Sequence, residues 1–162
     1  MHQQHQYALT VQWAGNTGLG TSHYRSYSRS HTIIVPDKVA ILASSDPAFL
    51  GDQTKHNPEE LFLASIAACH MLWYLHLCAE AGVVVLAYTD QATGTMTVTP
   101  AGGGHFTGVT LSPTVQVQHP AMLGKANALH EEANKRCFIA NSCNFPIHHK
   151  PTCLTKDAPN EA

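Results

Sequence analysis

The sequence predicts an α+β fold, and three observations lead to that prediction. One long apolar segment carries strong helix-start signals at Asn57 and Pro58. Two strand-like segments follow it, joined by a glycine-rich turn, and a second segment with helical spacing precedes one last strand. Strands grouped before and after helices are typical of α+β proteins, whereas a parallel doubly wound sheet requires regular alternation.

The bulk composition is that of one folded domain, so we expect residues 1–162 to form a single domain with frayed ends at 1–6 and 156–162. Hydrophobic residues make up 44% of the chain and charged residues 12%, which argues against disorder and favours a surface hidden in an oligomer. The formal net charge of -2 provides no basic field for nucleic acid.

The cysteine content favours a reducing compartment. The number of cysteines, five, is odd, and the first residues contain no apolar core of a signal peptide. We therefore expect a cytoplasmic protein whose cysteines are structural, metal-binding or catalytic rather than permanently bridged. The cysteines are Cys69, Cys78, Cys137, Cys143 and Cys153.

The segment before the long helix has strand composition interrupted by turns. Residues 7–13 favour a strand that ends at the turn 15–18. Residues 21–35 favour one long strand or two short ones, and residues 39–42 favour another short strand. Residues 44–56 contain turn-forming Ser, Asp, Pro and Gly and are expected to form a loop.

The long helix has the clearest boundaries. Asn57 suits the N-cap, Pro58 suits the first helical position, and Glu60 occupies the acidic position of a capping box. Gly82 is a C-terminal stop, so the helix should run to about residue 81. Its apolar stretch has the length of a membrane span, but it lacks basic flanks. We therefore expect a helix buried between sheets or between subunits, and no membrane span.

The C-terminal half completes the element order. Residues 83–100 and 105–117 are expected to form a long hairpin around a glycine turn. Residues 120–136 carry apolar side chains at helical spacing and predict a second helix. A short turn or helical piece over 138–142 and a last strand over 145–154 follow.

Two cysteines are candidates for a redox pair. Cys69 lies deep in the long helix and Cys137 at the end of the second helix, although a buried helical cysteine is normally inert packing. Cys78 lies about 13 Å from Cys69 along the helix axis and half a turn out of phase, so these two cannot form a disulfide. Cys143 is a rival to Cys137. The positions that share a helix face with Cys69 are Phe62, Ser65, Leu72, Trp73 and His76.

A reactive thiol at Cys69 needs a neighbouring cation, because burial opposes ionisation of the thiol. Arg25 and Arg29 are the candidates: four residues apart in a strand-like segment, they would project from the same face. Such an arginine needs an acid to orient it, and Glu59 is the natural choice. Each of these three side chains also suits an ordinary surface role.

Twelve histidines suggest a metal site, but their spacing does not. The sequence contains no Cys-x-x-Cys, His-x-x-x-His or His-Glu-x-x-His pattern. His148 and His149 are neighbours on an expected strand and should point to opposite faces, while His70 and His76 lie on different helix faces. We therefore expect structural or surface histidines and no bound metal.

The segment 57–69, which begins Asn-Pro-Glu-Glu and ends Ala-Ala-Cys, resembles the OsmC/Ohr family (osmotically inducible protein C and organic hydroperoxide resistance proteins). The family motif is an Asn-Pro-Glu helix start with a cysteine ten residues after the Glu, and Glu59 and Cys69 match that spacing. Cys137 resembles the second family cysteine, which ends the second helix. The element order agrees over residues 7 to 154.

This resemblance implies an OsmC-like fold, with antiparallel sheets around a long central helix in an intertwined homodimer. It also implies a thiol peroxidase for oxidative-stress defence that reduces organic hydroperoxides. Cys69 would attack the peroxide and become a sulfenic acid, and Cys137 would condense with it to a disulfide. Arg25 or Arg29, held by Glu59, would stabilise the thiolate. The resemblance implies no cofactor; a dithiol protein, for which a lipoyl group is one candidate, would be the reductant.

Two other functions remain open from the residues. A non-enzymatic binding module would use an apolar interface pocket for a lipid-like ligand and would leave Cys69 with ordinary thiol reactivity. A redox or metal sensor would use Cys137, Cys143, Cys153 and His148, and would be purified with stoichiometric metal.

Overall fold

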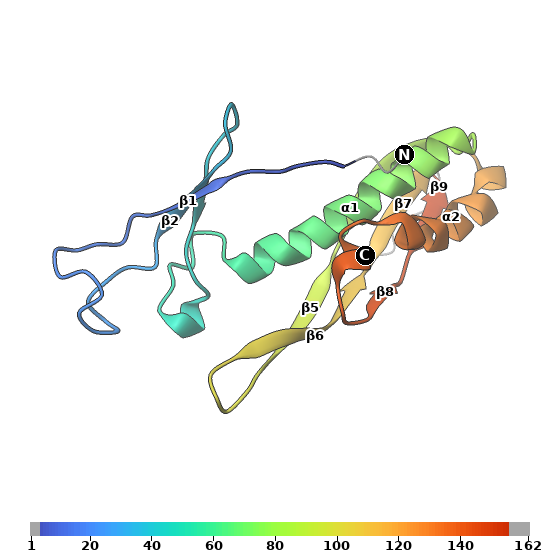
Figure 1. The fold of residues 1–162 in the computed structure, drawn as a ribbon. Coiled ribbons are helices and arrows are strands. Elements are labelled where there is room, and N and C mark those ends of the chain that lie inside the picture. The colour runs from blue at the N-terminus through green and yellow to red at the C-terminus, as the bar shows by residue number, and fades with distance from the viewer. Residues whose placement is uncertain (1–3, 156–162) are drawn as a thin grey trace. The chain divides into compact units, whose positions relative to one another are not determined.

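The computed structural model describes residues 4–155 and has a mixed α+β architecture with three small sheets and two main helices (Figure 1). The chain forms two compact units, Met1–Phe62 and Leu63–Ala162. The prediction of a single domain stays a prediction. Of the predicted frayed ends, residues 1–3 and 156–162 lie outside the described residues, and residues 4–6 are exposed and outside any helix or strand.

The first unit is built on one antiparallel sheet with the strand order β1-β2-β3. These strands are β1 (Thr10–Trp13), β2 (His31–Ile34) and β3 (Ile41–Ala43), and the short 3-10 helix η1 (Pro47–Phe49) lies in the predicted loop. All three predicted strand regions therefore contain a strand, but each strand is shorter than predicted.

The strand predicted over residues 21–35 is wrong in its first half, which folds as turns before β2 begins. Asn16 Oδ1 accepts hydrogen bonds from the backbone N–H of Gly18 (2.9 Å) and Gly20 (3.1 Å). Such local bonds from side chain to backbone compete with a strand ladder. Arg25 therefore lies in a turn, and it does not share a strand face with Arg29 as predicted.

The long helix α1 (Pro58–Glu80) begins and ends where predicted. Asn57 Oδ1 accepts from the backbone N–H of Glu60 at 2.8 Å, and the Glu60 carboxylate accepts from the backbone N–H of Asn57 at 3.1 Å. This capping box contributes about 1 kcal/mol to the stability of the helix. Gly82 follows with a φ of 70°, a conformation that ends the helix and that glycine adopts without strain.

Only one face of α1 is buried within this chain. By length and composition alone α1 could cross a membrane, a test that the core helix of a soluble protein also passes. Its buried face carries Ile66, His70, Tyr74, Leu77 and Cys78. The other side includes the apolar Leu72, which is 63% exposed. The prediction that this helix is buried is thus confirmed for one of its faces.

The second unit contains two sheets, with the strand orders β4-β7-β9 and β5-β6-β8. In each sheet the first two strands are antiparallel and the last is parallel to its neighbour. The strands are β4 (Val85–Asp90), β5 (Thr93–Val98), β6 (Gly104–Leu111), β7 (Pro113–Val117), β8 (Ile147–His149) and β9 (Thr152–Thr155).

Each strand predicted for this unit is divided in two. The predicted hairpin is confirmed, but it changes sheets where Asp90 Oδ1 accepts from the backbone N–H of Ser112 at 2.7 Å. The strand predicted over residues 145–154 is broken at Pro151, which has no N–H to donate to a ladder. At both breaks, one predicted strand becomes two shorter strands that belong to different sheets.

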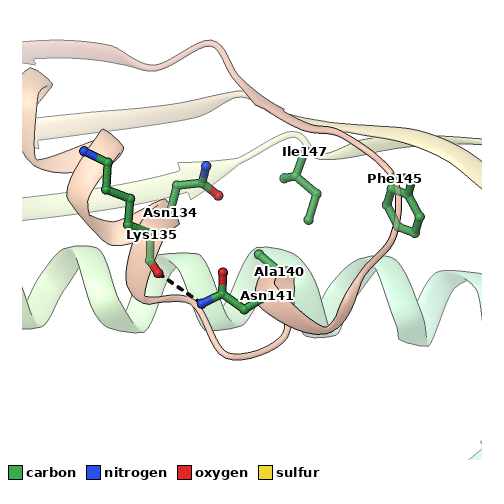
Figure 2. Close-up of a pocket in the computed structure, with 6 residues that line it drawn as sticks. All are labelled: Asn134, Lys135, Ala140, Asn141, Phe145 and Ile147. Carbon is green, nitrogen blue, oxygen red and sulfur yellow. Dashed lines mark hydrogen bonds between the residues drawn. The ribbon is translucent and has the colours of Figure 1, made fainter.

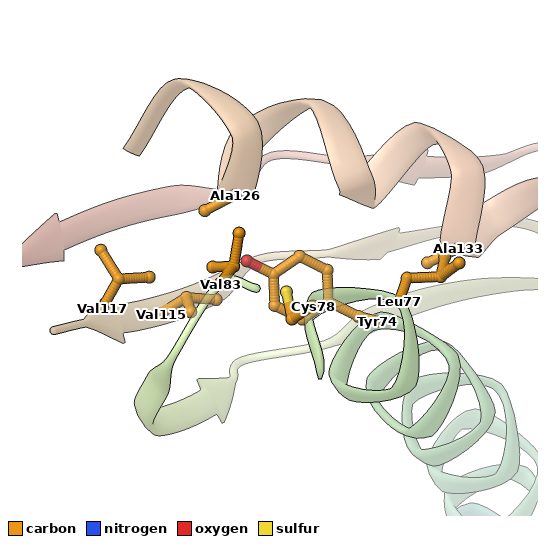
Figure 3. Packing of buried hydrophobic residues seen from close by; sticks show 8 residues of the cluster. All are labelled: Tyr74, Leu77, Cys78, Val83, Val115, Val117, Ala126 and Ala133. Carbon is orange, nitrogen blue, oxygen red and sulfur yellow. The ribbon is translucent and has the colours of Figure 1, made fainter. Parts of the chain in front are cut away.

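The second helix, α2 (Leu123–Arg136), packs on α1 and on β7 (Figure 3). It follows the 3-10 turn η2 (Pro120–Met122) and precedes η3 (Ala140–Ser142), both within the predicted helical regions. Ala126 and Ala133 are fully buried in this interface, and their small side chains allow α2 to approach closely. The residues of this core cluster are Tyr74, Leu77, Cys78, Val83, Val115, Val117, Ala126 and Ala133.

Candidate active site

The predicted redox pair, Cys69 and Cys137, comes together in the second unit. Cys69 lies in the middle of α1 and is partly exposed, whereas Cys137 caps the C-terminus of α2 and is fully buried. The Cys69 thiol lies close enough to the Cys137 thiol to contribute to its raised pKa. Both cysteines are free. Two elements far apart in the sequence therefore bring two thiols close together.

The turn after α2 fixes Cys137. Its sulfur accepts a hydrogen bond from the backbone N–H of Ala140 at 3.4 Å. Asn141 donates from its side chain to the carbonyl of Lys135 at 3.0 Å and lines a pocket of about 280 Å³ beside the turn (Figure 2). Burial and the neighbouring Cys69 thiol raise the pKa of Cys137 to about 12, so Cys137 is a protonated thiol at neutral pH.

An apolar pocket lies near Cys69 along α1. Leu72, Trp73 and His76, which the helical spacing placed on the face of Cys69, line an apolar pocket of about 220 Å³. The Trp73 ring packs edge-on against Phe138, the residue after Cys137, with 5.5 Å between ring centroids. The pocket therefore lies one helical turn from Cys69 and offers mainly apolar contacts.

The predicted acid and arginines lie in the first unit, where the structure does not pair them. Glu59 Oε2 is buried and has no hydrogen-bond partner among residues 4–155. Arg29 donates to the carbonyls of Tyr24 and Tyr27, at 2.6 Å each, and its guanidinium lies 4.4 Å and 4.2 Å from the centroids of their rings. Arg25 is exposed and forms no hydrogen bond or ion pair within the described part of the chain. Of these two arginines, Arg25 is therefore the one whose guanidinium has no partner within residues 4–155.

The other cysteines occupy different surroundings. Cys143 donates to the carbonyl of Ile139 at 3.3 Å, and burial raises its pKa. Cys153 Sγ lies 3.9 Å from the hydroxyl of Tyr74. Across residues 4–155, no three His, Cys, Asp or Glu side chains are arranged to hold a metal ion. The donor set suggested for a sensor is therefore not gathered into one site.

Three histidines that were predicted to be separate structural or surface residues lie together in the structure. His70 and His130 are 1% and 2% exposed, and His70 Nε2 lies 3.1 Å from His130 Nδ1. The His149 ring lies 4.5 Å from that of His70, between centroids, and the Tyr74 ring stacks on His130 at 3.9 Å. His148 is exposed, as strand alternation predicted. The missed signal was the position of His70 between Ile66 and Tyr74, at four-residue spacing along α1.

Burial keeps these histidines uncharged. Desolvation, with smaller contributions from neighbouring histidines, lowers the pKa of His70 to about 3 and that of His130 to about 4. Burial also lowers the pKa of His149. The cluster is therefore neutral across the physiological range, and its ring nitrogens act as single donors or acceptors.

Comparison with known proteins identifies the family. A family model described as OsmC-like protein matches residues 51–151, which is more than half of the chain. This chain belongs to the OsmC family. A search of the curated proteins found no match.

Solved structures of OsmC proteins share this fold over nearly the whole chain. An OsmC-like protein of unknown function from Vibrio cholerae is 29% identical, with a TM-score of 0.82, covering 91% of this chain and 99% of the other. An organic hydroperoxide resistance protein OsmC from Legionella pneumophila is 18% identical, with a TM-score of 0.65, covering 93% and 98%. A putative organic hydroperoxide resistance protein from Vibrio cholerae, with captopril bound in one active site, is 21% identical, with a TM-score of 0.61, covering 94% and 95%.

The buried histidines make this OsmC protein sensitive to acid. Between the ordinary histidine pKa of 6.5 and the lowered values of His70 and His130, the unfolded chain binds protons that the folded chain does not. We therefore expect the contribution of these two histidines to stability to be complete above pH 6.5 and to fall as the pH falls, by up to about 1.4 kcal/mol per pH unit for each histidine. Urea unfolding at pH 7, 6 and 5 measures this slope.

Two variants assign the slope to the cluster. His70→Gln should flatten it, whereas His105→Gln, at an exposed position on β6, should leave it unchanged. A free energy of unfolding that is the same at pH 7 and pH 5 in the wild-type protein would contradict the assignment.

Proposed function

We propose that this protein is a cysteine-based peroxidase that reduces organic hydroperoxides in oxidative-stress defence. The observation that carries the proposal is that α1 and α2 place the thiol of Cys69, which is partly exposed, close to that of Cys137, which is buried. An accessible sulfur can meet a peroxide, and a protected sulfur beside it can close a disulfide. The names of some solved OsmC proteins, as organic hydroperoxide resistance proteins, agree with this function.

The proposed reaction has two chemical steps on the protein. The Cys69 thiolate attacks one peroxide oxygen, the O–O bond breaks, and the other oxygen leaves as an alcohol after taking a proton, so that Cys69 becomes a sulfenic acid. The Cys137 sulfur then attacks the Cys69 sulfur, the S–S bond forms as the S–O bond of the sulfenic acid breaks, and the released hydroxyl leaves as water with the thiol proton of Cys137. An external dithiol, for which a lipoyl group is one candidate, reduces the disulfide by thiol exchange.

The first step is favoured by a positive charge near the Cys69 thiolate, because a neighbouring cation stabilises the charged form of a thiol. We assign this role to Arg25, oriented by Glu59. The buried, unpartnered oxygen of Glu59 supports a guanidinium partner. Arg25 is unpaired within residues 4–155, while Arg29 is engaged by its neighbouring tyrosines, so Arg29 is the weaker choice.

The apolar pocket supports an organic peroxide as the substrate. Trp73, Leu72 and the nearby Phe138 offer apolar surface one turn from Cys69. Such a surface stabilises a bound alkyl or aryl group and contributes nothing to the binding of hydrogen peroxide. The same pocket also favours the second candidate function, a binding module for a lipid-like ligand.

The assembly and location remain part of the proposal. The exposed apolar side of α1, which includes Leu72, supports a homodimer in which a second copy covers that side. Five free cysteines support a cytoplasmic location, where thiols stay reduced. No cofactor, nucleic acid or membrane span is required by the proposed chemistry.

The redox chemistry is tested by titrating reduced protein with cumene hydroperoxide and mapping peptides without reduction. We expect one equivalent of peroxide to produce a Cys69–Cys137 disulfide. Cys69→Ser should abolish peroxide consumption, and the matched control Cys143→Ser should leave it intact. Thiols that survive the titration, or oxidation confined to Cys143 or Cys153, would favour the binding module instead.

The substrate assignment is tested at Trp73. Trp73→Ala should raise KM for cumene hydroperoxide about tenfold, because a lost aromatic contact costs roughly 1–1.5 kcal/mol of binding. Steady-state kinetics with hydrogen peroxide provide the control, since that substrate has no apolar group for the pocket. An equal loss on both substrates would show that Trp73 supports the fold rather than the substrate.

A further inference from the structure

The interface between α1 and α2 brings the two reactive thiols together, and few polar contacts hold it. At one end Cys69 meets Cys137. At the other end Lys125 Nζ on α2 donates to the carbonyl of Ala81, just beyond α1, at 2.7 Å. Between these ends lies the hydrogen bond between His70 and His130, which is the buried polar contact between the helices.

Each histidine of this pair lies on the same helix as one of the two cysteines. His70 directly follows Cys69 on α1, so any shift of one moves the other. His130 lies two turns before Cys137 on the same helix, α2. A bond between the two imidazoles therefore limits both the sliding and the rotation of one helix against the other.

Neighbouring aromatic rings restrict the movement of the two hydrogen-bonded imidazoles. His70 is held between the rings of His130 and His149, with centroid distances of 5.4 Å and 4.5 Å. His130 is also stacked on Tyr74, with 10° between the ring planes, and its Nε2 lies 4.0 Å from Cys153 Sγ. The hydrogen bond at the ring edges and the Tyr74 ring stacked on one face of His130 restrict ring rotation. A buried polar pair also tolerates few alternative arrangements.

We propose that His70 and His130 are positioning residues that hold Cys69 against Cys137 for disulfide formation. They touch neither the peroxide nor the reacting sulfurs, and they act by fixing α1 against α2. The histidines gain and lose no atoms in the disulfide-forming step, which involves the two cysteines alone. The histidines lower the cost of bringing the two sulfurs together, which raises the effective concentration of one thiol at the other.

This inference rests on the proposed peroxidase function, because disulfide formation is a step of that reaction. Its test, however, needs no peroxide. Protein dithiol and glutathione disulfide equilibrate to a protein disulfide and two molecules of reduced glutathione. Peptide mapping at defined glutathione ratios gives the equilibrium constant for the Cys69–Cys137 disulfide. A wild-type protein that forms this disulfide in glutathione but consumes no peroxide would sink only the proposed function.

Two substitutions at one site separate the hydrogen bond from packing. His130→Phe keeps an aromatic ring against Tyr74 but removes the Nδ1 partner of His70, and we expect the equilibrium constant to fall about tenfold. His130→Asn places an amide group near the position of Nδ1, and we expect it to stay within about threefold of wild type. His70→Leu, which removes the bond from the α1 side, should match His130→Phe.

A control variant distinguishes positioning from general loss of stability. Lys125→Met removes the polar contact at the far end of the interface and should leave the equilibrium constant unchanged, even if urea unfolding shows lower stability. A wild-type equilibrium constant in both His130→Phe and His70→Leu would overturn the inference. So would an equal fall in Lys125→Met, or no Cys69–Cys137 disulfide in oxidising glutathione.

Discussion

The close approach of the thiols of Cys69 and Cys137 is the constraint on which the functional account depends. One sulfur comes from the middle of α1 and the other from the end of α2, so their meeting requires these helices to pack closely and in one register. Fully buried Ala126 and Ala133 permit that approach, and the turn held by Ala140 and Asn141 places the second sulfur.

The same core that brings the thiols together raises the pKa of the Cys137 thiol through burial and through its neighbouring thiol. The histidines in this core, His70 and His130, are held neutral by burial. This interior therefore supplies geometry but no positive charge to the reaction. In the proposed reaction the apolar core sets the distance between the sulfurs, and the role of supplying positive charge is assigned to Arg25.

Features set by local sequence were predictable, and features set by long-range pairing were not. The ends of α1 depend on Asn57, Glu60 and Gly82, which act within one helical turn, so they were predicted closely. The division of the long hairpin depends on a bond from Asp90 to a distant backbone N–H, which no local pattern shows. The histidine cluster likewise joins α1, α2 and β8. The pairing of Cys69 with Cys137 was predicted from a family resemblance, because spacing alone leaves Cys143 as a rival.

The most direct test of the central claim is to trap the first oxidation product. The Cys137→Ser variant, which cannot close the disulfide, would be treated with one equivalent of cumene hydroperoxide in the presence of dimedone and analysed by peptide mass spectrometry. The account predicts a dimedone adduct on Cys69, since the sulfenic acid formed there has no partner thiol. An unmodified Cys69, or an adduct found only on Cys143 or Cys153, would contradict it.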